Sequence, residues 1–230
     1  MVRESELRFF VCPRLDTQYT LFIGMFEYQI YKYQFSVLCW RKELELRSTG
    51  HRVGERERRK TEEEYATLRT KADELLKHIR ECLAEDEYVE DRTEINDLYE
   101  QILLKVHPAL NDYHNENRND ILQQAEKAYR KGRKYLLKSL AELADGFIIR
   151  DYDRETDDEI VFEARNSLRE KCAELEKKVS EMENSYPYTQ KDFLSDEGRV
   201  RERQNTLNRK VYDLKEEAEY YYRKLGELNG

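Results

Sequence analysis

The sequence predicts an all-α fold in which two long antiparallel, coiled-coil-like helical hairpins flank a central helix–loop–helix. Charged residues make up 39% of the chain and hydrophobic residues another 39%, a composition that is typical of long packed helices. Only 3 prolines and 8 glycines interrupt the 230 residues, and both residue types are costly inside helices. Apolar residues also recur at alternating spacings of four and three, which is the heptad pattern of helices that pack side by side.

The first hairpin is predicted over residues 17–85, after an apolar N-terminal segment (1–16) that we expect to pack across it. Its first helix has a continuous heptad seam of Tyr19, Ile23, Phe26, Ile30, Tyr33, Val37, Trp40 and Leu44. Further apolar residues widen this face, so the helix should contact more than one partner. A second seam consists of Thr61, Tyr65, Leu68, Ala72, Leu75, Ile79 and Cys82. The short connection between the two seams makes the helices antiparallel.

The central region is predicted over residues 91–146. An apolar stripe marks its first helix: Ile95, Leu98, Ile102 and Val106. His107 ends this helix, because the residue before a proline is pushed out of the α conformation. An Asn-rich loop follows, as expected for a turn. A second helix runs to about Tyr129, and a short further helix ends near Gly146.

A linker at 147–158 leads to the second hairpin, which is predicted over 159–230. Its first helix has the stripe Ala164, Leu168, Cys172, Leu175, Val179 and Met182, and its second has Val200, Leu207, Val211, Leu214, Ala218, Tyr221, Leu225 and Leu228. An aromatic loop at 185–194 joins them and is expected to cover the end of the hairpin. Self-association is a further prediction, since the apolar seams may exceed what two hairpins bury.

The remaining features argue against several classes of function. A net charge of −8 disfavours nucleic acid and anionic membranes as partners. Because Met1 is not followed by a basic and then an apolar leader, we expect a soluble, cytoplasmic protein. The charged run at 55–60 mixes arginines with acids, which favours a solvated helix start over a localisation or RNA-binding signal. No phosphate loop, nucleophile elbow or close pair of metal ligands is present, so neither an enzyme nor a cofactor or metal site is predicted. The 4 cysteines are widely separated and are expected to pack as reduced apolar residues.

Residues 95–143 resemble a J-domain, the co-chaperone module of the DnaJ type. The similarity rests on Leu98-Tyr99, Leu103-Leu104-Lys105, His107-Pro108, Asn111, and Ala125 with Ala128-Tyr129. The whole chain is more loosely similar to a group of bacterial J-domain-like proteins, through Cys12-Pro13-Arg14, Glu27-Tyr28 and the Tyr-Pro-Tyr loop at 186–188. The resemblance implies a helical corner whose loop contacts an ATP-driven chaperone of the Hsp70 type and stimulates its ATPase.

Two departures from the family pattern predict that this activity is lost. Ala109 replaces the family's aspartate, so a charge-assisted contact of about 1.5–3 kcal/mol is missing. Glu100 and Gln101 stand where the family has basic residues, and a negative side chain repels an acidic partner. We therefore expect a non-enzymatic protein-interaction scaffold with a degenerate J-like module. Its candidate partner-binding residues are Lys105, His107, Pro108, Ala109 and Asn111.

Two alternatives remain open at this point. In the first, the protein is a co-chaperone that still regulates an Hsp70-type ATPase through His107 and Lys105. In the second, the His-Pro pair is only the end of a helix in an ordinary helical hairpin.

Overall fold

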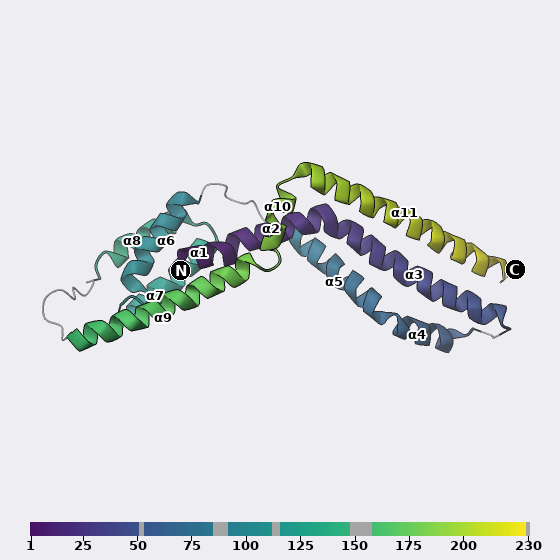
Figure 1. The fold of residues 1–230 in the computed structure, drawn as a ribbon, viewed down its shortest axis with the longest axis horizontal. Coiled ribbons are helices and arrows are strands. Elements are labelled where there is room, and N and C mark those ends of the chain that lie inside the picture. The colour runs from purple at the N-terminus through teal and green to yellow at the C-terminus, as the bar shows by residue number, and fades with distance from the viewer. Residues whose placement is uncertain (51–52, 85–91, 112–115, 148–157, 229–230) are drawn as a thin grey trace. The chain divides into compact units, whose positions relative to one another are not determined.

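The computed structural model describes residues 1–50, 53–84, 92–111, 116–147 and 158–228, and these residues contain helices and no strand (Figure 1). The predicted all-α class is therefore confirmed. The predicted boundary at 85–91 and most of the linker at 147–158 lie outside the described residues. The chain divides into two compact units: the first unit combines Met1–Arg14 with Glu87–Thr189, and the second unit combines Leu15–Asp86 with Gln190–Gly230. Among the described helices, none is long and apolar enough to cross a membrane.

Three consecutive helices form the centre of the first unit: α6 (Thr93–Val106), α7 (Glu116–Arg130) and α8 (Lys134–Ala144). At the beginning of α6, Glu94 forms an ion pair with Lys134 at the beginning of α8. At the other end, Lys105 of α6 forms an ion pair with Asp145, directly after α8. The two pairs join corresponding ends of the helices, so α6 and α8 run parallel.

Tyr129 lies at the centre of the core of the first unit. Its side chain is fully buried, and its hydroxyl donates a hydrogen bond of 2.7 Å to Asn96 Oδ1, which places the end of α7 beside the start of α6. Its ring stacks on Tyr99 at 4.2 Å and meets Phe10 edge-on at 5.0 Å. Phe10 belongs to η1 (Leu7–Val11), which continues the N-terminal helix α1 (Val2–Glu6). The N-terminal segment therefore packs in the core of the central helices, which corrects the expectation that it crosses the first predicted hairpin.

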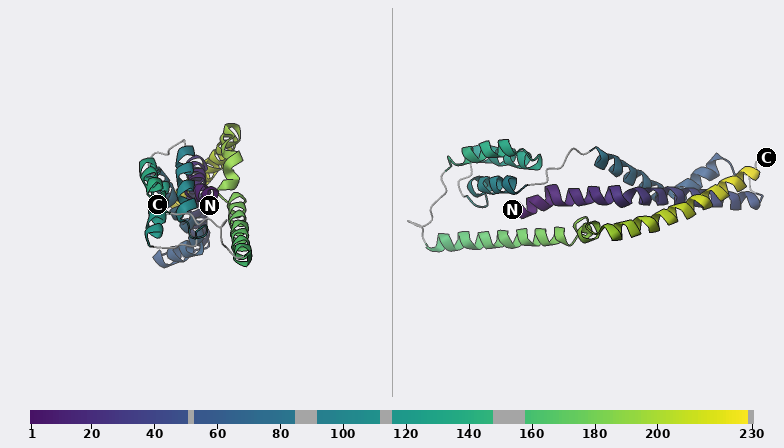
Figure 2. Two further views of the ribbon diagram at one scale, coloured as in Figure 1. Left: turned by 90° about the vertical axis from the view of Figure 1, so that its left-hand side faces the viewer. Right: turned by 90° about the horizontal axis from the view of Figure 1, so that it is seen from above.

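The second unit begins within α2 (Cys12–Tyr19) and contains η2 (Thr20–Gly24), α3 (Met25–Ser48), α4 (Glu55–Glu64), α5 (Ala66–Leu83), α10 (Lys191–Leu194) and α11 (Glu197–Glu227). Helix α5 runs antiparallel beside α3, and α11 lies along α3 as well (Figures 1 and 2). Ile23 and Ile30 pack with Leu207 and Val211 of α11 in the core of this unit.

The helices predicted to form a hairpin over 159–230 have other partners. Helix α9 (Asp158–Glu183) belongs to the first unit and contacts α1 and η1. Arg3 of α1 donates hydrogen bonds to Glu183 Oε1 at 2.8 Å and to the hydroxyl of Tyr188 at 3.3 Å, and Tyr188 begins the short helix η3 (Tyr188–Gln190). Helix α11 packs along α3 in the second unit, and this arrangement corrects the predicted hairpin. The broad apolar face of α3 accounts for it, because this helix accommodates both α5 and α11.

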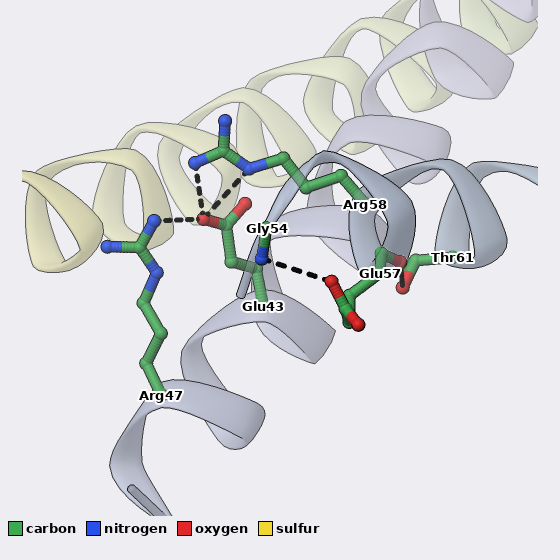
Figure 3. A network of polar contacts seen from close by, with 6 residues as sticks. All are labelled: Glu43, Arg47, Gly54, Glu57, Arg58 and Thr61. Atoms are coloured by element: carbon green, nitrogen blue, oxygen red, sulfur yellow. Dashed lines mark hydrogen bonds and ion pairs between the residues drawn. The ribbon is translucent and has the colours of Figure 1, made fainter. Parts of the chain in front are cut away.

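A polar network joins the end of α3 to the start of α4 (Figure 3). Glu43 Oε1 accepts hydrogen bonds from Arg47 Nη2 at 2.5 Å and from Arg58 Nη2 at 2.8 Å. At the start of α4, the backbone N–H of Gly54 donates to Glu57 Oε2 at 3.2 Å. The charged run that opens α4 is thus a helix start, as predicted, and one of its arginines, Arg58, pairs with Glu43 of α3.

A cavity of about 380 Å³ adjoins this network in the second unit. Its walls include Trp40 and Tyr222, whose ring centroids lie 5.4 Å apart, and the thiol of Cys39. Burial, and then the charge of Glu62, raises the pKa of Cys39 to about 11. This cysteine is therefore an unreactive thiol at neutral pH.

Candidate functional site

The loop after α6 contains the residues predicted to bind a partner, and its backbone is tightly held. His107 has extended dihedral angles (φ −70°, ψ 128°), as expected for a residue that precedes a proline. The N–H groups of Leu110 and Asn111 both donate to the carbonyl of His107, at 2.9 and 3.1 Å. This loop is therefore a compact turn that fixes the position of the imidazole.

The imidazole of His107 is neutral at physiological pH. Its Nδ1 accepts a hydrogen bond of 3.1 Å from the backbone N–H of Ala109, so the proton of the neutral ring lies on Nε2. Burial lowers the pKa of His107 below 6.5, and the positive charges of Lys171 and of the N-terminal amine lower it further. The ring thus presents a hydrogen-bond donor without a positive charge.

Asn111 has a structural position in this loop. Its side chain is buried, and its amide group donates to the carbonyl oxygens of Leu104 at 3.0 Å and His107 at 3.3 Å. The contact with Leu104 satisfies a backbone acceptor at the end of α6 that has no helical partner, because Pro108 has no N–H. Asn111 thus holds the helix end and is not presented to a partner.

Lys105 is also engaged within the first unit. Its ammonium group pairs with the carboxylate of Asp145, and its side chain is only 25% exposed. On the same helix, Glu100 and Gln101 are exposed. The accessible surface of α6 near the loop therefore carries an acid and an amide in place of a free cation.

His107 and Ala109 face a cavity of about 270 Å³ in the first unit. The cavity walls come from the N-terminal segment and from α6, α7 and α9: Met1, Glu4, Ser5, Tyr99, Leu103, Glu126, Lys171, Glu174, Leu175 and Lys178. Within α9, Lys178 donates to Glu174 at 2.7 Å, and burial raises the pKa of Tyr99 to about 12. The cavity combines a neutral imidazole with lysines and carboxylates, so it is suited to hydrogen bonding with a polar group.

The sequence located part of this site and missed the rest. His107 and Ala109 lie at the cavity, whereas Pro108 is exposed beside it. The contribution of α9 was missed because nothing in a heptad stripe identifies which helix it will meet. His114, the second histidine of the predicted loop, lies outside the described residues.

A second cluster of functional groups was not predicted from the sequence. Asp16, His78 and Cys82 come together in the second unit. The spacing of His78 and Cys82 by one helical turn was a usable signal, since such residues share a helix face.

No family model matches the chain, and no curated protein or solved structure matches it either.

Proposed function

We propose that the protein acts by binding another protein and that its J-like corner does not stimulate an Hsp70-type ATPase. The proposal rests on one observation: the predicted binding residues of the loop form contacts within the first unit. Lys105 is paired with Asp145, Asn111 holds the end of α6, and His107 faces a cavity walled by α1 and α9. A J-domain needs such residues at the chaperone interface, where paired and buried groups are poor partners.

Exposed leucines on α6 and α8 supply the proposed binding surface. Leu104 is 52% exposed and Leu143 is 62% exposed. The ion pair between Lys105 and Asp145 brings these two leucines to the same end of the parallel helices. Exposed apolar side chains that lie close together are typical of protein-binding sites. We therefore propose that the partner binds at this end of α6 and α8, where Leu104 and Leu143 are exposed.

A steady-state ATPase assay with the Hsp70-type chaperone of the same organism separates this proposal from the co-chaperone alternative. We expect no stimulation by the wild-type protein. If Ala109→Asp alone confers stimulation, the scaffold is J-like and was inactivated at that residue. Stimulation by the wild type that disappears in His107→Gln would overturn the proposal.

The binding surface has its own test. Cross-linking in cell extract followed by identification of the captured protein is compared between the wild type and the variants Leu104→Glu and Leu143→Glu. We expect both substitutions to abolish capture of the same protein, because a carboxylate in an apolar contact is strongly unfavourable. Leu83→Glu is the matched control, since Leu83 is 68% exposed on α5 of the second unit. Equal loss of capture in the control would contradict the assignment of the face.

A further inference from the structure

Three side chains with metal-binding atoms meet in the second unit: Asp16 of α2, and His78 and Cys82 of α5. Oδ2 of Asp16 lies 2.7 Å from Nε2 of His78. Sγ of Cys82 lies 3.8 Å from the same Nε2 atom. One donor atom of each residue lies within 4.8 Å of the other two. We propose that this cluster is a binding site for Zn²⁺.

The convergence on one ring nitrogen distinguishes a metal site from a catalytic triad. In a Cys–His–acid triad, the thiol contacts one nitrogen of the imidazole and the acid orients the ring through the other. Here both Asp16 and Cys82 approach Nε2 of His78. A proton relay from thiol to carboxylate through the ring is therefore absent from these contacts. Three donors that surround a common point are the arrangement that a metal ion requires.

The distances fit tetrahedral zinc after a small movement. With Zn–N and Zn–O bonds of about 2.0–2.1 Å and a Zn–S bond of about 2.3 Å, tetrahedral geometry separates N from S by about 3.6 Å and N from O by about 3.3 Å. The separation of 3.8 Å between Cys82 and His78 is already close to the first value. The 2.7 Å contact between Asp16 and His78 is shorter than the second. The carboxylate must therefore retreat by roughly 0.6 Å as the metal replaces the hydrogen bond.

The kinds of donor select the metal. A thiolate, an imidazole and a carboxylate suit Zn²⁺, whereas Mg²⁺ and Ca²⁺ prefer shells of oxygen atoms. Cys82 is buried, while the side chain of Asp16 is 24% exposed and that of His78 is 39% exposed. One side of the site therefore opens to solvent, where a water molecule can complete the tetrahedron.

A carboxylate also lies near the other ring nitrogen of His78, beyond hydrogen-bonding distance. Oε2 of Glu81 lies 3.9 Å from Nδ1 of His78, the ring nitrogen that does not face the cluster. Metal-bound histidines commonly direct this second N–H toward a carboxylate, which fixes the tautomer that leaves the other nitrogen free for the metal. Bound zinc would connect α2 with α5 and so join two parts of the second unit that are far apart in sequence.

The test uses the full chain, freed of metal with a chelator and kept reduced. Titration with Co²⁺ should give one bound ion per chain, with visible bands of a tetrahedral site and a thiolate-to-cobalt charge-transfer band. Zn²⁺ should displace the cobalt. Cys82→Ser should remove the charge-transfer band. Asp16→Asn and His78→Gln should lower Zn²⁺ affinity by more than the roughly 10- to 100-fold that is typical of losing an outer partner.

Cys172→Ser is the matched control, because Cys172 is an exposed thiol on α9, and its substitution should leave the spectrum and the affinity unchanged. Circular dichroism checks that each variant is folded, and Asp16→Asn retains a partly exposed amide of the same shape if Cys82→Ser does not fold. Absence of cobalt binding, a spectrum without the charge-transfer band, or equal affinity in wild type and Asp16→Asn would overturn the proposal. The cluster would then be an ion pair beside a buried cysteine.

Discussion

Replacing Tyr129 tests whether the first unit is built around the aromatic cluster. Tyr129→Ala removes a fully buried ring that stacks on Tyr99 at 4.2 Å and meets Phe10 at 5.0 Å. Truncation of a buried aromatic residue to alanine costs about 3–5 kcal/mol. The lost hydrogen bond to Asn96, which is 2.7 Å long, adds about 0.5–1.5 kcal/mol. Since these contributions overlap, we expect a total loss of about 4 kcal/mol, a large part of the stability of an ordinary domain.

Tyr129→Phe separates the hydroxyl from the ring. It keeps the contacts of the ring with Tyr99 and Phe10 and removes the hydrogen bond to Asn96, so the expected loss is about 1 kcal/mol. The matched control is Tyr135→Ala, because Tyr135 is 86% exposed on α8 and its loss should change stability by less than about 0.5 kcal/mol.

Hydrogen exchange of individual helices is the suitable assay, because a chain with two units need not unfold in one step. In Tyr129→Ala, we expect the amide protection of α6, α7 and α8 to fall. A loss below about 1 kcal/mol in these helices, well under the range for truncating a buried aromatic residue, would refute the central role of Tyr129. A control variant that loses as much protection as Tyr129→Ala would refute it as well.

Three further predictions concern the loop and the cysteines. Asn111→Ala removes two partly buried hydrogen bonds and should destabilise the first unit by about 1–3 kcal/mol in thermal unfolding, whereas Asn117→Ala, at an exposed position, should not. Burial lowers the pKa of His107 below 6.5, so the unfolded chain binds more protons at this residue. Its contribution to stability is therefore full above about pH 6.5 and is lost as pH falls toward the folded-state pKa. The unfolding midpoint of the wild type should therefore fall as the pH drops below about 6.5, and this part of the pH dependence should be absent in His107→Gln. Iodoacetamide at pH 8 should modify the exposed Cys172 well before Cys39, whose pKa is about 11, and equal rates by mass spectrometry would contradict this.

The positions of the helices were predictable from local patterns, whereas the helix that packs along α11 was not. The heptad seam from Tyr19 onward and the proline after His107 identified α3 and the end of α6, because both signals are local. The partner of α11 was mispredicted because its stripe of Leu and Val specifies a buried face without specifying the helix that covers it. The short loop at 185–194 suggested a hairpin, but the wide face of α3 offers a larger contact.

The same limit applies to the candidate sites. His107 and Ala109 could be chosen from the sequence, since both belong to one short motif. The walls supplied by Glu4 and Lys178 could not, because they lie far away in sequence and carry no pattern of their own. Of the proposed metal cluster, His78 and Cys82 could be recognised in the sequence, because they lie one helical turn apart. Asp16 could not, because only the folded chain brings it close to them.

The origin of Phe10 has a consequence for the biosynthesis of the protein. This residue precedes the other buried residues of its core cluster by 85 positions or more, since they begin at Ile95. Contacts so distant in sequence form slowly, and a growing polypeptide exposes Phe10 until the ribosome has released α6 and α7. The apolar face of the long helix α3 likewise stays partly uncovered until α11 is made, because α11 is translated more than a hundred residues later. Both units therefore complete their cores late in synthesis, and a peptide limited to residues 92–147 would leave an edge of the Tyr129 ring uncovered.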